Sequence, residues 1–152
     1  QLVLSVAAGY DLNGPSMAAA AQDAIRLSRY TFPEGKPINT LVRVVSDGTV
    51  SKMDGCRICG PRVHYMPEAV VPGVEYFFVE LGVLDLPDAD GHALMSHEWT
   101  HFLQYHAGAE WNTCAAEEEA VGVQNLYLAE HGLPPVPVWH PDCAAAPVTT
   151  QR

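Results

Sequence analysis

The feature that most constrains the fold is an uninterrupted run from His92 to His106, which contains neither proline nor glycine. Within it lies the motif His97-Glu98-Trp99-Thr100-His101. On an α-helix, residues four apart lie one above the other, so the motif places two imidazoles on one face. Such a pair can bind one metal ion, and the acid between them can take a proton from a bound water. The sequence therefore predicts a helix with a metal site on it.

The flanking residues support a helix over residues 91–105. Asp88 and Asp90 are N-cap candidates, and Gly108 lies where the helix would end. The alternative interpretation is an amphipathic helix whose two histidines are only hydrogen-bonded. Burial of these polar groups without a partner would cost several kcal/mol, which favours the metal site. One face of the helix carries polar and apolar residues together, namely Leu94, His97, His101 and Gln104.

A catalytic zinc ion usually has three protein ligands and one open position. The metzincin pattern is excluded, because Gln104 and Ala107 stand where it requires glycine and a third histidine. A second helix, residues 114–131, begins with three acids, Glu117, Glu118 and Glu119. Glu117 is the best candidate because its helical face is mostly apolar and therefore predicted to be buried: Ala120, Val121, Gln124, Tyr127 and Leu128. Glu118 or Glu119 remains an alternative, and a solvated acidic first turn is typical of any helix.

These two helices resemble those of the gluzincin metallopeptidases, and the chain's size is similar to that of the single-domain minigluzincins. The resemblance covers roughly residues 90 to 131 and implies a small zincin-like domain with a bound Zn²⁺. It implies His97, His101 and Glu117 as the ligands and Glu98 as the general base in peptide hydrolysis.

The resemblance also implies a place for the substrate. In gluzincins an extended peptide lies along the edge strand before the motif helix, which implies this role for residues 74–84. The chain departs from thermolysin-like enzymes at Val121, where they have a polar residue that supports a zinc histidine. The outer shell of the site must therefore come from elsewhere. Three side chains are candidates for stabilising the oxyanion, with nothing to select among them: Tyr127, His131 and His140.

The rest of the chain predicts a single α+β domain over residues 1–152, with about three helices packed on a small, mainly antiparallel sheet. A helix is expected over 17–29, and strands are expected over 40–45, 49–52, 62–66 and 74–84. Asp47-Gly48 predicts a hairpin turn between the first two strands. Prolines exclude a helix after Gly132, so residues 133–152 are predicted to form an extended tail.

The four cysteines allow three pairings, of which we prefer Cys56–Cys59 with Cys114–Cys143. The Cys56–Cys59 segment is interpreted as a local disulfide. Half of a zinc knuckle with His64 and a redox site are the alternatives. Gly60-Pro61 follows instead of a helical run, which disfavours a thioredoxin-like site.

The formal charge of −10 and the presence of only two lysines disfavour binding to nucleic acid and to anionic membranes. No run approaches the roughly eighteen apolar residues of a membrane-spanning helix. The chain begins at Gln1 rather than Met, which suggests either a trimmed chain or a mature form after removal of a signal peptide. Together with the cysteines, this indicates a secreted or periplasmic protein.

The function that these features favour is a zinc-dependent hydrolase, most simply a peptidase acting on a peptide or protein substrate. Two other classes compete with it. One is a zinc-stabilised binding module without hydrolytic activity. The other is a secreted dithiol protein that works through Cys56 and Cys59.

Overall fold

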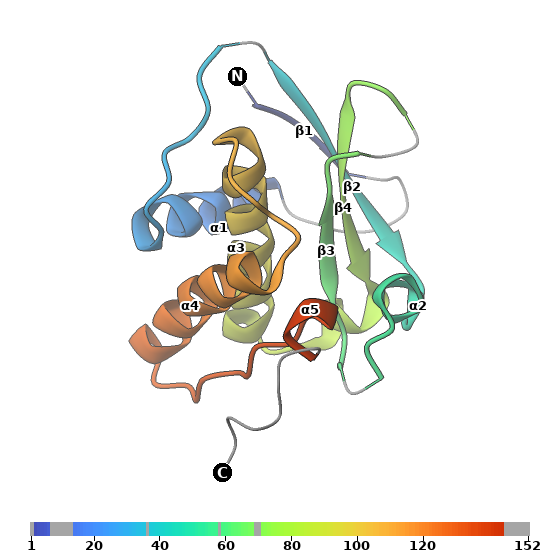
Figure 1. The fold of residues 1–152 in the computed structure, drawn as a ribbon, viewed down its shortest axis with the longest axis vertical. Coiled ribbons are helices and arrows are strands. Elements are labelled where there is room, and N and C mark those ends of the chain that lie inside the picture. Colours follow the sequence, from blue (N-terminus) through green and yellow to red (C-terminus); the bar gives the residue numbers. More distant parts are fainter. Residues whose placement is uncertain (1, 7–13, 36, 58, 69–70, 145–152) are drawn as a thin grey trace.

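The structure, a computed structural model, describes residues 2–6, 14–35, 37–57, 59–68 and 71–144 and has the expected α+β architecture (Figure 1). The elements follow in the order β1 Leu2–Val6, α1 Gly14–Leu27, β2 Ile38–Val45, α2 Thr49–Asp54, β3 Val63–Met66, β4 Val74–Glu80, the 3₁₀ helix η1 Leu81–Asp85, α3 Asp88–His106, α4 Cys114–Glu130 and α5 Pro141–Ala144.

The four strands form one mixed sheet in the order β1-β2-β4-β3. β1 pairs with β2 and β2 with β4 in parallel, and only β3 runs antiparallel to its neighbour β4. The expectation of a mainly antiparallel sheet was therefore wrong. The physical reason is the connections: α1 links β1 to β2, and both α2 and β3 lie between β2 and β4, so the chain returns to the same end of the sheet each time.

Two further predictions need correction. Residues 49–52 were expected to be a strand after a hairpin turn, but they form α2, and Gly48 precedes the helix with φ 85°. The buried Glu80 carboxylate accepts the backbone N–H groups of Val50, at 2.9 Å, and Arg62, at 3.0 Å. This long-range contact fixes the first turn of α2 beside β4, which a local turn signal does not reveal. The strand predicted over 74–84 ends at Glu80, where η1 begins.

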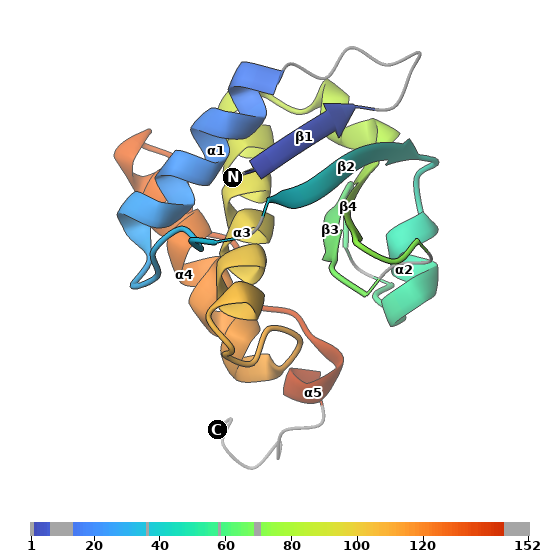
Figure 2. The ribbon, with the colours of Figure 1, turned by 90° about the horizontal axis from the view of Figure 1, so that it is seen from above.

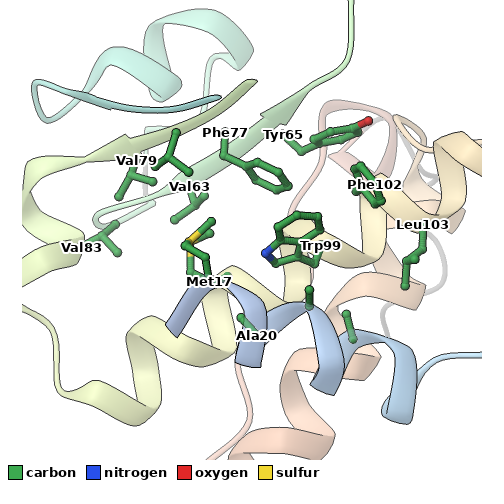
Figure 3. Packing of buried hydrophobic residues seen from close by; sticks show 14 of the residues in the cluster. Met17, Ala20, Val63, Tyr65, Phe77, Val79, Val83, Trp99, Phe102 and Leu103 are labelled. Atoms are coloured by element: carbon green, nitrogen blue, oxygen red, sulfur yellow. The ribbon is translucent and has the colours of Figure 1, made fainter. Parts of the chain in front are cut away.

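The elements form layers (Figure 2). α1 and α3 lie on one face of the sheet, α4 packs against the far side of α3, and α2 lies on the other side of the sheet. The main core fills the space between the sheet and the helices α1 and α3 (Figure 3), with the rings of Phe77 and Trp99 4.5 Å apart. Trp99 stands at the centre of the motif and faces the sheet. Since successive helical residues are 100° apart, the two motif histidines face the other way, toward α4.

Three helices are joined by a polar cluster near the C-terminal end of α1. Arg26 on α1 bonds to Glu130 on α4 at 2.7 and 2.8 Å and to Asp23 at 2.9 Å. His92 on α3 lies 2.7 Å from Asp23. The cluster fixes α3 and α4 relative to each other through α1.

The ends of the two site helices are well defined. α3 ends before Gly108, as predicted, and this glycine has φ 73°. Asp88 and Asp90 lie inside the first turn of α3, not at the N-cap, which Pro87 occupies. α4 is capped by Thr113, whose side chain accepts the N–H of Ala116.

Candidate metal centre

The two motif histidines come together on the face of α3 that is turned toward α4. Each is 7% exposed, and the ring centroids lie 5.0 Å apart. Together with Glu98 they form a group whose ligand atoms all lie within 4.8 Å of one another. A buried group of two imidazoles and a carboxylate could hold a metal ion, and the donor types suit zinc.

Glu117 reaches the same place from α4. Its Oε1 atom lies 3.1 Å from His97 Nε2 and 2.8 Å from His101 Nε2. Ligand atoms bound tetrahedrally at the usual zinc distances of about 2.0–2.1 Å stand roughly 3.3 Å apart, which is close to the two distances from Glu117 Oε1. The face of α4 that was expected to be buried is buried, whereas Glu118 is exposed and Glu119 bonds to Arg29 of the segment after α1.

Glu98 is the second carboxylate at this place. Its Oε2 atom lies 3.2 Å from His97 Nε2 and 3.9 Å from His101 Nε2. Its other oxygen accepts the backbone N–H of Tyr65, on β3, at 2.6 Å. Of the two acids, Glu117 lies closer to both histidines and has a more symmetrical position between them. Glu98 is displaced to one side and held by the sheet.

Two glutamines support the histidines from behind. Gln124 Oε1 lies 2.8 Å from His97 Nδ1, and Gln104 Oε1 lies 2.8 Å from His101 Nδ1. An amide oxygen only accepts, so each Nδ1 carries a proton, and a metal ion would take the place of any proton at Nε2. This is the tautomer that a metal bound at Nε2 needs.

The sequence reasoning left this outer shell unassigned. Both glutamines stood on faces already predicted to be buried, Gln104 on the motif face of α3 and Gln124 on the Glu117 face of α4. A buried amide at such a position needs a hydrogen-bond partner, and that was the available signal.

The charges of the site are strongly coupled. Burial alone would lower the pKa of His97, but the Glu117 carboxylate outweighs it and raises the pKa to about 9. Burial would likewise raise the pKa of Glu117, but the two imidazoles hold it well below its usual range. Glu117 is therefore ionised near neutral pH, which is the state that binds a cation.

The histidines and both acids open into a cavity of about 300 Å³ between α3, α4, β3 and the C-terminal segment. β3 stands at the edge of the sheet, and its Tyr65 N–H points to Glu98. The resemblance implied residues 74–84 as the substrate strand. β4 instead lies between β2 and β3, with its backbone groups paired on both sides, so that assignment is wrong.

Of the three oxyanion candidates, only His140 lines the cavity. Its Nδ1 accepts the N–H of Asp142, and its Nε2 lies 3.0 Å from Asn112 Oδ1. Tyr127 and His131 stack on each other further along α4, and neither lines the cavity. His64, on β3, also lines the cavity, and burial lowers its pKa.

The C-terminal segment forms one wall of the cavity through Val136, Pro137, Trp139 and His140. Asn125 on α4 bonds to both backbone groups of Val136, at 3.1 and 2.8 Å. Arg62 lies over the Trp139 ring, 5.7 Å from its centroid. The predicted extended tail therefore holds through residue 140 and is then interrupted by the short helix α5, while residues 145–152 lie outside the described part.

Two disulfides are present, Cys56–Cys59 and Cys114–Cys143, as preferred from the sequence. The first excludes a zinc knuckle in this state, because its thiols are paired. The second joins the C-terminal segment to the start of α4, three residues before Glu117.

Comparison with protein-family models and with curated proteins gives no match for this chain. The residues of the site therefore carry the functional argument. Among the described residues, no helix is long and apolar enough to cross a membrane. Two disulfides are typical of proteins in oxidising compartments, which fits the expected extracellular or periplasmic location.

Proposed function

We propose that the chain is a zinc-dependent hydrolase that cleaves peptide bonds, with His97, His101 and Glu117 as the zinc ligands. The observation that carries the proposal is the position of Glu117 Oε1 between the two Nε2 atoms, at 3.1 and 2.8 Å. The glutamine acceptors behind both rings support it, because they set the tautomer that presents Nε2. A bound zinc ion supplies a Lewis acid that acidifies water and polarises a carbonyl.

Glu98 acts as the general base. The Tyr65 N–H holds one of its oxygens, which leaves the other directed at the site. This carboxylate takes a proton from water in the cavity and later delivers it to the leaving amine. An extended peptide would add to the outer edge of β3, pairing with backbone groups other than the Tyr65 N–H, which Glu98 occupies. His64 lines the cavity and can donate a hydrogen bond to the developing oxyanion, whereas both ring nitrogens of His140 are already paired, with the Asp142 N–H and with Asn112 Oδ1.

A non-hydrolytic zinc-stabilised module is the second candidate, and one distance favours it. Glu98 Oε2 lies only 3.2 Å from His97 Nε2, so Glu98 could close the site as a fourth ligand. Structural zinc sites are closed in this way, whereas catalytic sites keep one position open. The two candidates therefore differ in the role of a single carboxylate.

The test is zinc content and affinity together with hydrolysis of a mixed fluorogenic peptide library. Wild type is expected to bind one zinc per chain, and His97→Ala to bind none. Glu98→Gln should keep the wild-type zinc affinity and lose hydrolysis. Glu117→Gln should lose more than the roughly 10- to 100-fold in affinity that removal of an outer partner costs.

Three outcomes decide against parts of the proposal. A well-folded wild-type protein without zinc would exclude the metal site. Full activity in Glu98→Gln would exclude its role as base. A loss of zinc affinity in Glu98→Gln as large as that in Glu117→Gln would favour the closed, non-hydrolytic site.

A further inference from the structure

The side chain of Gln104 is fully buried, and every one of its hydrogen-bonding atoms is used. Its Nε2 atom donates to the Ala116 carbonyl oxygen at 3.0 Å and to Glu119 Oε1 at 2.9 Å. A primary amide has two N–H donors and one oxygen, so both donors are occupied on the α4 side. The oxygen is thereby turned toward His101 Nδ1, 2.8 Å away.

Glu119 is the acceptor that demands this orientation. Its Oε1 atom also accepts the Tyr30 hydroxyl at 2.5 Å, and its Oε2 atom accepts Arg29 Nε at 2.7 Å. A carboxylate paired with Arg29 offers only acceptors, so it can face the nitrogen of Gln104 and never its oxygen.

We propose that Glu119 is a positioning residue for the metal ligand His101, acting through the Gln104 amide. The inference rests on the proposed metal site. The Glu119 carboxylate fixes the amide, the amide oxygen fixes the ring and its Nδ1 proton, and His101 Nε2 is thereby aimed at Glu117. A charged acceptor at the far end also polarises the chain of hydrogen bonds and makes the imidazole a better donor to a cation.

The other ligand histidine provides an internal reference. His97 Nδ1 bonds to Gln124 and has no bond to Glu119 or Gln104 among the described residues. A change at Glu119 should therefore reach His101 and spare His97. A general loss of fold or charge would affect both rings.

The experiment measures zinc affinity by competition with a chromophoric chelator. Loss of an outer partner costs about 10- to 100-fold. Glu119 lies one hydrogen bond further out, so Glu119→Gln should weaken zinc binding by about threefold to tenfold. Glu118→Gln is the matched control, since it removes the same charge from an exposed neighbour and should stay within about twofold of wild type. Tyr30→Phe removes a buried hydroxyl but keeps the Glu119–Gln104 bond, and it should also stay within about twofold.

A double-mutant cycle tests whether Glu119 acts on His101 through the Gln104 amide. If Glu119 acts through the amide, Glu119→Gln in a Gln104→Met background should change zinc affinity by less than about twofold. In zinc-loaded protein, NMR should show faster solvent exchange of the His101 Nδ1 proton in Glu119→Gln, with the His97 proton unchanged.

An unchanged zinc affinity in Glu119→Gln would overturn the inference, as would an equal loss in Glu118→Gln or an undiminished effect in the Gln104→Met background. None of these outcomes contradicts the proposed metal site, because each comparison can be made only if the wild-type protein binds zinc. A wild-type protein that binds no zinc would overturn the proposed function and this inference together.

Discussion

At the scale of single residues, the candidate metal centre contains acceptors behind the histidines as well as the proposed ligands themselves. His97 and His101 are each met by an amide oxygen at 2.8 Å. The two amides differ in their own support. Gln104 is anchored by a carboxylate, whereas Gln124 comes from the same helix as Glu117, seven residues later, and so moves with that ligand.

The contribution of Gln124 to zinc affinity can therefore be tested separately from that of Gln104. Gln124→Met has nearly the same volume but offers no oxygen to His97 Nδ1, so zinc affinity should fall by about 10- to 100-fold. The metal-free protein should lose about 1–3 kcal/mol of its unfolding free energy, since the shape of the side chain is kept but the buried His97 Nδ1–H loses its acceptor. Chelator competition and urea denaturation measure the two quantities. An unchanged zinc affinity would show that His97 needs no partner at Nδ1.

The sequence predicted the residues that meet at the site better than it predicted their supports. Helical spacing alone placed His97 and His101 on one face and selected Glu117 among three adjacent acids. Gln104 and Gln124 were seen on those faces but had no assigned partners, because a pairing between two helices depends on their relative position. That position is set by tertiary packing, which periodicity within one helix does not contain.

At the scale of elements, one face of α3 packs in the core and the opposite face carries the motif histidines. Trp99 and Phe102 are fully buried against the sheet side, while the histidines face α4. The long periodic helices were predicted within a few residues of their observed bounds. The short elements were not: α2 and the order of the strands depend on contacts such as Glu80 with Val50 and Arg62, which join residues far apart in the chain.

The cluster that ties α1 to α3 and α4 gives a pH-dependent contribution to stability. Burial would raise the pKa of Asp23, but hydrogen bonds from His92 and Arg26 lower it below its usual 3.8. A lowered folded-state pKa means that the contribution is present above the unfolded value and is lost as the pH falls through the folded value. Asp23→Asn should therefore destabilise the protein at pH 7, and its deficit relative to wild type should shrink below about pH 4.

Urea denaturation of chelator-treated protein between pH 7 and pH 3 measures this deficit without interference from metal release. Glu118→Gln, which removes an exposed acid from outside the cluster, is the control. A deficit that stays constant across the range would show that the Asp23 carboxylate contributes nothing through its charge.

At the scale of the whole molecule, the core and the candidate metal centre are largely separate. The main apolar cluster lies between the sheet and the helices α1 and α3, and the two disulfides cross-link the chain without a metal. We therefore expect that the fold does not depend on a metal in the way that a zinc finger does.

Removal of zinc should accordingly lower stability without unfolding the protein. Free zinc at a hundred times its dissociation constant adds about 2.7 kcal/mol. For a domain of this size that corresponds to a rise of roughly 5–10 °C in melting temperature. Calorimetry with and without a chelator measures the shift, while circular dichroism should show unchanged helix content at 25 °C. His97→Ala should show no shift, and loss of helices on chelation would indicate a metal-dependent fold.

The disulfide between Cys114 and Cys143 links the helix that carries a proposed metal ligand to the segment that forms a wall of the cavity. Cys114 opens the helix that presents Glu117, and Cys143 follows directly on the segment that walls the cavity. If the protein is produced in a reducing cytosol, this disulfide does not form. The C-terminal segment is then no longer tied to α4, and the first turn of α4 loses its covalent anchor. Zinc affinity and hydrolysis measured on such a sample would be too low. The redox state of the cysteines should therefore be determined before either quantity is measured.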